Sequence, residues 1–178
     1  MRHSKKASAS LVPLRELERI AGAANVLSRP EDLMLYEYDG LSAQAMPDAV
    51  VFPSTTAEVS QVVKLAGDHD IPVIARGAGT GLSGGAVVTE RGIVLGFSRM
   101  NKIVEIDIEN QRARVQPGVV NLDLSRAVSD FGYYYAPDPS SQKACTLGGN
   151  VAENSGGPHT LASGVTTNHL LGLEMVLP

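Results

Sequence analysis

A mixed fold of helices and sheet is predicted by three features of this sequence. Residues 49–75 pass from an apolar run through an amphipathic stretch to a second apolar run, which is the pattern of a strand, a helix and a strand. Residues 102–116 show the two-residue alternation of a hairpin. With 178 residues, 43% apolar and 19% charged, the chain suits one domain or slightly more. A chain of this size can bury about 70% of its unfolded surface.

Two helical segments are expected ahead of the first strand, over residues 14–25 and 31–36. The first strand is predicted at 49–53. The helix after it has Thr55 as its N-cap, and Glu58 three residues later completes a capping box. Its buried stripe consists of Val59, Val62, Val63 and Ala66. This spacing places one face of the helix against the sheet.

A glycine-rich loop follows the next strand, which is predicted at 71–75. The strand, helix, strand order implies a right-handed crossover between parallel strands. The segment RGAGTGLSGGA, residues 76–86, therefore leaves the carboxyl end of a parallel strand, where open α/β sheets usually hold ligands. Five of these residues are glycines. Each glycine disfavours order by roughly 0.5 to 1 kcal/mol relative to alanine, so a ligand or a required turn must offset several kcal/mol.

Several interpretations of this loop have different sequence requirements. Gly79, Gly81 and Gly84 fit G-x-G-x-x-G, but strand-like residues follow instead of the helix that a dinucleotide fold requires. A phosphate loop of the ATPase kind needs a lysine, and this segment has none. A nest of exposed N–H groups around an anion remains possible. Three or four hydrogen bonds to a charged acceptor, at about 1.5 to 3 kcal/mol each, would exceed the glycine cost. A plain multi-turn loop is the structural alternative.

A strand, a hairpin and a helix are predicted next. The strand covers residues 92–97, and the hairpin arms are residues 102–108 and 112–116. The apolar face of the hairpin carries Val104, Ile106, Ile108, Ala113 and Val115. The other face pairs acids with arginines across the strands and solvates the sheet. The helix begins at Asn121 as N-cap and ends at Gly132. Its buried stripe is Leu124, Ala127, Val128 and Phe131.

The composition changes after Tyr135. Residues 136–164 are rich in glycine and proline and have few large apolar side chains, which would suit a flexible linker. The stretch TLGGNVAENSGG, residues 146–157, has no low-complexity repetition, and small and amide side chains between its paired glycines could line a ligand. An apolar strand is predicted within residues 169–178. Because a domain seldom ends on such a strand, we expect this chain to be the front part of a longer polypeptide.

Composition argues against several classes of function. The net charge of −4, with scattered basic residues, argues against a nucleic-acid surface. No run of about 18 apolar residues is present, so no membrane span is expected. The basic N-terminus is interpreted as a frayed end, with a transit peptide as the alternative. The single cysteine, Cys145, cannot form an internal disulfide, which fits a reducing compartment, and it is expected to pack as a small buried residue.

The motifs, taken in order, resemble a known flavoprotein family. VVFPSTTAEV, IPVIARGAGTGLSGGA, RARVQPGV, YYAPDPSS and CTLGGNVAENSGG are similar in order and spacing to the FAD-binding domain of the FAD-linked oxidases typified by p-cresol methylhydroxylase and vanillyl-alcohol oxidase. Within that superfamily the chain most resembles the glycolate oxidase flavoprotein subunit and D-lactate dehydrogenase group. The resemblance begins near Tyr36. It implies an α+β fold of two α+β subdomains with FAD extended between them. Residues 1–46 would form a helical lead segment, and residues 47–178 a C-terminally truncated FAD-binding domain.

The resemblance also implies which residues hold FAD. The pyrophosphate would lie in the loop formed by Arg76, Gly77, Ala78, Gly79, Thr80, Gly81, Leu82, Ser83, Gly84 and Gly85. Residues close to the cofactor would be Pro137, Asp138 and Ser141. The ribityl and flavin side would be lined by Thr146, Gly148, Gly149, Asn150, Asn154, Gly156 and Gly157. Gly164 matches a family glycine that usually follows Lys-Tyr, here replaced by Ala162 and Ser163. Ala78 stands where relatives with covalent flavin often carry histidine, so noncovalent FAD is expected.

The reaction implied by the resemblance is oxidation of a small 2-hydroxy acid to the 2-oxo acid, with electrons passing to FAD. Catalytic and metal-ligating residues of such relatives lie in a later domain, so none is assigned here. Expected partners are the hydroxy acid and other oxidase subunits or an electron acceptor, in the cytoplasm or peripheral to a membrane. The alternatives are another oxidoreductase of the superfamily and a noncatalytic anion- or nucleotide-binding module. Residues 1–178 alone are expected to bind FAD weakly and to show no turnover.

The histidines have separate interpretations. His159 matches a position often occupied by histidine in the glycolate oxidase group, and it either approaches the flavin or is a loop residue with a backbone partner. His3 and His69 are interpreted as solvated surface residues, and His169 as the start of the last strand. With Cys145 isolated, no cysteine and histidine set has the spacing of metal ligands, and no metal is expected.

Overall fold

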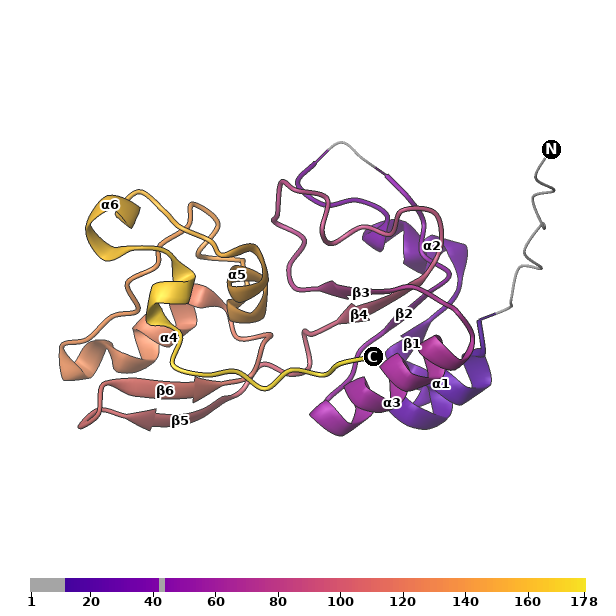
Figure 1. Cartoon of the computed structure of the whole chain (residues 1–178), viewed down its shortest axis with the longest axis horizontal. Helices are drawn as coiled ribbons and strands as arrows, with labels where there is room; N and C mark the ends of the chain where they lie inside the picture. The colour runs from indigo at the N-terminus through magenta and orange to yellow at the C-terminus, as the bar shows by residue number, and fades with distance from the viewer. Residues whose placement is uncertain (1–11, 42–43) are drawn as a thin grey trace.

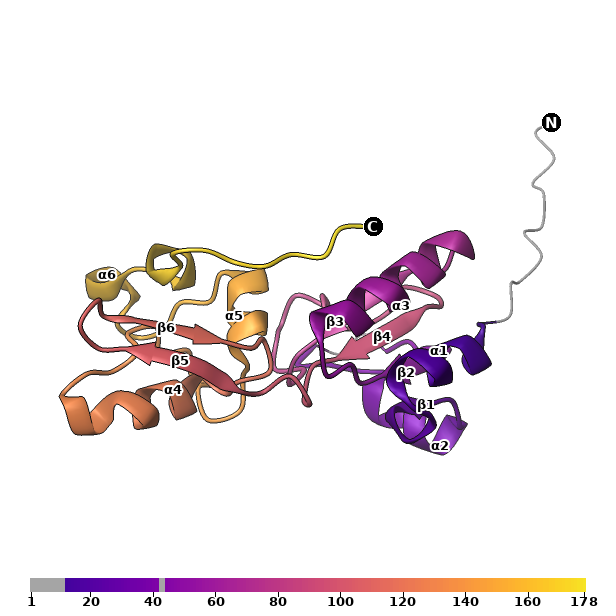
Figure 2. The same cartoon turned by 90° about the horizontal axis from the view of Figure 1, so that it is seen from below.

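The computed structural model describes residues 12–41 and 44–178, which form two lobes side by side (Figures 1 and 2). The first lobe contains α1 (Leu14–Ala21), η1 (Ala23–Asn25), β1 (Val26–Leu27), α2 (Pro30–Leu33), η2 (Met34–Tyr36), β2 (Ala49–Val51), α3 (Thr56–Asp68), β3 (Val73–Arg76) and β4 (Ile93–Gly96). The second contains β5 (Ile103–Asp107), β6 (Arg112–Val115), α4 (Asn121–Val128), η3 (Ser129–Phe131), α5 (Leu147–Glu153), α6 (Thr160–Ser163) and η4 (Thr166–His169). The last residues return to the first lobe, where Thr56 donates a hydrogen bond to Glu174 at 3.0 Å.

The predicted strand, helix, strand unit forms the centre of the first lobe. Its sheet has the order β1-β2-β4-β3, with β2, β4 and β3 parallel and β1 antiparallel to β2. Strand β4 lies between β2 and β3, so Val94 is opposite both Val50 and Ile74. The glycine loop leaves the carboxyl end of β3, as predicted.

Both faces of this sheet are covered, because alternate residues of its buried strands point to opposite sides. One face packs against α1 and α3 through Ala49, Val51, Ile93 and Leu95. The other face packs against Leu33 of α2 and against Val88. Helix α3 begins as predicted, with Thr55 Oγ1 accepting from the Glu58 N–H at 3.2 Å. The Glu58 carboxylate accepts from the N–H of Ser54 at 2.7 Å, one residue before the N-cap.

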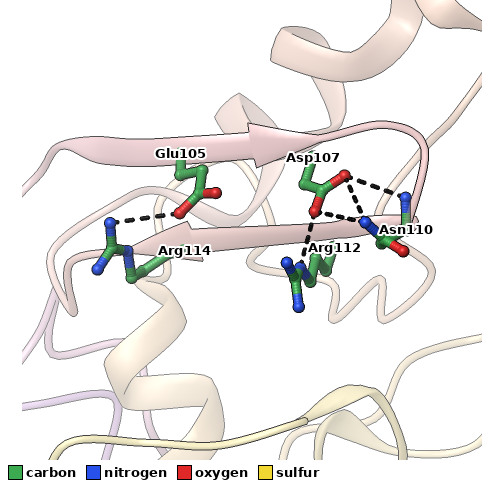
Figure 3. Close-up of polar contacts among 5 residues, drawn as sticks. All are labelled: Glu105, Asp107, Asn110, Arg112 and Arg114. Atoms are coloured by element: carbon green, nitrogen blue, oxygen red, sulfur yellow. Dashed lines mark hydrogen bonds and ion pairs between the residues drawn. The ribbon is translucent and has the colours of Figure 1, made fainter.

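The hairpin of the second lobe carries the predicted ion pairs. Asp107 pairs with Arg112 at 2.9 Å and Glu105 with Arg114 at 3.3 Å, on neighbouring positions of β5 and β6 (Figure 3). The prediction that Val104 belongs to the apolar face is wrong. The register shifts between Ile103 and Glu105, which leaves Val104 51% exposed and places Ile103 against the core of this lobe.

Three further predictions in the second lobe are wrong. Asn121 is the first residue of α4, not its N-cap, and its buried side chain donates to the Pro137 carbonyl at 3.0 Å. Phe131 is 58% exposed, because the chain tightens into η3 and leaves the buried stripe. His169 ends η4 and starts no strand. Residues 170–178 form no helix or strand, and no strand among the described residues pairs with them.

Candidate functional site

The glycine loop after β3 meets the second lobe at two points. Thr146, the N-cap of α5, lies so close to Gly77 that a Cβ atom placed on Gly77 would overlap with Oγ1 of Thr146. Further along the loop, the Ser83 hydroxyl donates to Oε2 of Glu153 at 2.9 Å. The two glycine-rich segments of the sequence therefore lie side by side.

The backbone N–H groups of this loop have no acceptors within the part of the chain that the structure describes. From Gly77 to Ala86, none donates a hydrogen bond to any atom of residues 12–41 or 44–178. Gly79 and Gly84 have φ values of +68° and +77°, a left-handed conformation that lets neighbouring N–H groups converge. The loop therefore has the free donors that an anion-binding nest requires.

Arg76 lies beneath the loop. It is 7% exposed, and its Nη1 donates to the Ala86 carbonyl at 3.1 Å. The guanidinium lies 5.5 Å from the centre of the Tyr36 ring. Burial lowers the pKa of Arg76, and the nearby Asp39 carboxylate acts in the opposite direction. Because a Cβ on Gly79 would lie 2.8 Å from Cζ of Arg76, this arginine supports the loop from inside.

Residues 39–41 form a second wall of the loop, which the sequence analysis missed. The N–H of Gly40 donates to the Gly81 carbonyl at 3.0 Å. Asp39 accepts from the N–H of Leu41 through Oδ1 at 2.8 Å, and its buried Oδ2 has no partner in the part of the chain that is described. The Asp-Gly dipeptide is a turn signal that could have indicated this segment.

The N–H groups at the start of α5 already have acceptors within the second lobe. Thr146 Oγ1 accepts from the N–H of Gly149 at 3.3 Å, and the N–H of Gly148 donates to the Pro117 carbonyl at 2.8 Å. A Cβ on Gly148 would lie 2.6 Å from the Cβ of Pro117, so glycine here allows close packing. Any ligand contact of Gly148 and Gly149 must therefore come from atoms other than their N–H groups.

Of three other predicted site residues, Asn154 and Gly164 shape the turns that end α5 and α6, and Asn150 is buried within α5. Asn154 ends α5 with φ +50° and accepts from the N–H of Thr167 at 3.1 Å. Gly164 has φ +80° and ends α6. Asn150 is 2% exposed, and its Nδ2 has no acceptor among residues 12–41 and 44–178. Buried amides usually have partners, so Asn150 offers a donor for a ligand or a water molecule.

A hydrogen-bonded pair of side chains, Asp138 and His159, joins the loop of Pro137, Asp138 and Ser141 to the segment of Gly156 and Gly157. His159 Nδ1 lies 2.5 Å from Oδ2 of Asp138, and its N–H donates to Oδ1 at 3.4 Å. The hydrogen bond from His159 lowers the pKa of the Asp138 carboxyl. The imidazole therefore has a carboxylate partner, not the backbone partner suggested by the sequence.

The cysteine and the other histidines are not part of the glycine loop. Cys145 is buried, as expected. The imidazole of His69 is half-buried and lies 2.9 Å from the Leu65 carbonyl, so it is not simply a solvated residue. His3 lies outside the described residues. Within residues 12–41 and 44–178, no group of His, Cys, Asp and Glu side chains could hold a metal ion. The described helices are all too short or too polar to traverse a lipid bilayer.

The structure separates the predicted site residues into two groups. It brings the loop 76–85 together with Thr146 and with Glu153, a residue that the sequence analysis did not select. Asp138, Gly157 and His159 form a second group within the second lobe. Glu153 is the one charged residue of TLGGNVAENSGG, which was the available signal.

Comparisons with known proteins identify the family of this chain. A family profile described as an FAD binding domain matches residues 47–178. Glycolate oxidase subunit GlcD of Bacillus subtilis (strain 168) is 47% identical over 163 residues, which cover 91% of this chain and 35% of that protein. The chain thus spans 35% of the length of this curated relative.

Solved structures share the fold. An alkyldihydroxyacetonephosphate synthase aligns with a TM-score of 0.82 and 22% identity over 92% of this chain and 32% of that chain. A p-cresol methylhydroxylase with substrate bound aligns with a TM-score of 0.70 and 26% identity, over 80% and 29%. The free N–H donors of the loop, with Arg76 beneath them, fit the diphosphate of FAD. The chain belongs to the family of FAD binding domains, and its α+β fold is of the p-cresol methylhydroxylase type.

Proposed function

We propose that this chain is the FAD-binding part of a flavin-dependent oxidoreductase that oxidises a small 2-hydroxy acid. The observation that carries the proposal is the row of N–H groups from Gly77 to Ala86, which have no acceptor among residues 12–41 and 44–178, on a loop of the first lobe that contacts the second lobe through Ser83. Identity to a glycolate oxidase subunit supports the substrate class. Because that relative is much longer than this chain, the activity, substrate and subunit partners of a whole enzyme are part of the proposal.

Each group of residues has its own role in this proposal. The loop 76–85 binds the diphosphate through N–H groups, and Arg76 holds the loop and adds a positive charge beneath it. Thr146, Asn150 and their neighbours bind the ribityl and flavin side, and Nδ2 of Asn150, which has no acceptor in the described part of the chain, serves as a donor. Asp138 and His159 hold the loops on that side together. FAD, when bound without a covalent link, supplies the two-electron redox chemistry.

Ligand-dependent thermal unfolding tests the proposal. A ligand at 100 times its Kd that binds only the folded state adds about 2.7 kcal/mol of stability. We expect FAD to raise the melting temperature more than FMN, which lacks the diphosphate bridge and the adenosine. Equal stabilisation by ADP and FAD would favour a general nucleotide-binding module, and no response to FAD, FMN or ADP would contradict the proposal.

A turnover assay tests whether the catalytic residues lie within this chain or outside it. We expect the 178-residue chain to bind FAD weakly and to leave glycolate and D-lactate unoxidised. Robust reduction of bound FAD by either acid would show that the chain itself holds the substrate-binding and proton-accepting groups.

A further inference from the structure

Glu153 is an acidic side chain placed directly against the glycine loop. Its Oε2 accepts the Ser83 hydroxyl at 2.9 Å, and a Cβ built on Gly85 would lie 2.6 Å from its Oε1. Both oxygens of one carboxylate therefore face residues 83–85. Within residues 12–41 and 44–178, no other acidic side chain has a hydrogen bond with residues 77–86.

A carboxylate is an unfavourable neighbour for a phosphate site because like charges repel, although the exposure of Glu153 to solvent weakens this repulsion. The contact with Ser83 provides a compensating gain. Hydrogen bonds from a hydroxyl to a carboxylate are stronger than those between neutral groups, although this one joins two exposed side chains and at 2.9 Å is longer than the usual length of about 2.5 to 2.7 Å. The hydrogen bond to Ser83 therefore explains the position of Glu153 better than its negative charge does.

Helix α5 fixes the loop at two separated places. Thr146 at its N-cap lies against Gly77, and Glu153 at its last residue holds Ser83. The helix belongs to the second lobe and the loop to the first (Figure 1). The contact of Ser83 with Glu153 thus keeps the loop from moving away from the lobe that carries the predicted flavin side.

We propose that Glu153 is a positioning residue for the cofactor: by accepting the Ser83 hydroxyl, it holds the glycine loop against α5 with its N–H groups free for the diphosphate. This inference rests on the proposed function. The loop requires the acceptor oxygen and not the negative charge. Glutamine at position 153 should therefore preserve the site, whereas alanine should not.

The first test needs no ligand. Backbone ¹⁵N relaxation of the chain should show loop order parameters falling from about 0.85 toward 0.6 in Ser83→Ala and Glu153→Ala. Glu153→Gln should retain the parent values. Gly85→Ala, whose Cβ displaces the carboxylate, should also loosen the loop, whereas Gly81→Ala, with nothing within 4 Å of its Cβ, should not.

The second test is a double-mutant cycle on the Kd for FAD. Ser83→Ala and Glu153→Ala should each weaken binding about fivefold, as expected for one ordinary hydrogen bond. The double variant should also lose about fivefold, because both changes remove the same interaction. Glu153→Gln should bind FAD as tightly as the parent or more tightly.

Several results would overturn the inference. The first is a loss of FAD affinity near 25-fold in the double variant, the product of the two single losses. The second is an unchanged set of loop order parameters in Glu153→Ala. The third is equally tighter FAD binding by Glu153→Gln and Glu153→Ala. The last result would identify Glu153 as a merely repulsive charge. Failure of the proposed function would give a different result. The parent chain would then not bind FAD, while its loop order parameters would still depend on Ser83 and Glu153. That result would exclude FAD as the ligand but would leave the positioning contact intact.

Discussion

Replacing Gly79 with alanine should destabilise the chain through two separate effects. Its φ of +68° is left-handed, which costs an L-residue about 1 to 2 kcal/mol. The added Cβ would also lie 2.8 Å from Cζ and 3.3 Å from Nε of Arg76, so the guanidinium must move. Moving it weakens the hydrogen bond to Ala86 and the contact with Tyr36, for about 1 to 2 kcal/mol more. The expected loss of unfolding free energy is about 2 to 4 kcal/mol.

Thermal unfolding followed by circular dichroism measures this loss, which should lower the melting temperature by about 4 to 16 °C for a chain of this size. Gly81→Ala is the matched control, because it lies in the same loop, has no positive φ and leaves open space around the new Cβ. It should change stability by less than about 0.5 kcal/mol. Equal melting temperatures for the parent and both variants would refute the role assigned to Arg76 and to the left-handed turn.

Three other predictions concern the scaffold. Gly67→Ala in α3 should stabilise the chain by about 0.5 to 1 kcal/mol in denaturant unfolding, because its Cβ meets nothing within 4 Å; a loss of stability would contradict this. Thr55→Ala should cost about 1 kcal/mol by removing the cap of α3, and an unchanged midpoint would count against it. Hydrogen bonding to His159 lowers the pKa of Asp138. This hydrogen bond therefore stabilises the folded chain fully above the ordinary aspartate pKa, and the stabilisation is lost as pH falls through the lowered value. The parent should therefore lose stability in acid more steeply than Asp138→Asn, and parallel curves would exclude this linkage.

The first lobe was predictable because its signals are local. The strand, helix and strand of residues 49–76 follow from apolar runs and a capping residue, Thr55, that act within a few positions. The donors of the glycine loop were predictable for the same reason, since absent side chains leave N–H groups unshielded. Such signals need no knowledge of distant neighbours.

The errors concern features that distant contacts decide. Val104 alternates correctly in sequence, but a bulge moves it out of register. Phe131 continues the helical stripe, but the helix tightens before it. The placement of Arg76 beneath the loop and of Glu153 against it depends on segments far apart in the chain. No periodicity in the sequence reports such tertiary contacts.

Amide chemical shifts in a titration of the chain with FAD test the central claim most directly. If bare N–H groups bind the diphosphate, the largest shifts should fall on residues 77–86, and inorganic pyrophosphate should move the same amides in the same direction. Saturating FAD that leaves these amides unmoved while shifting others would contradict the account.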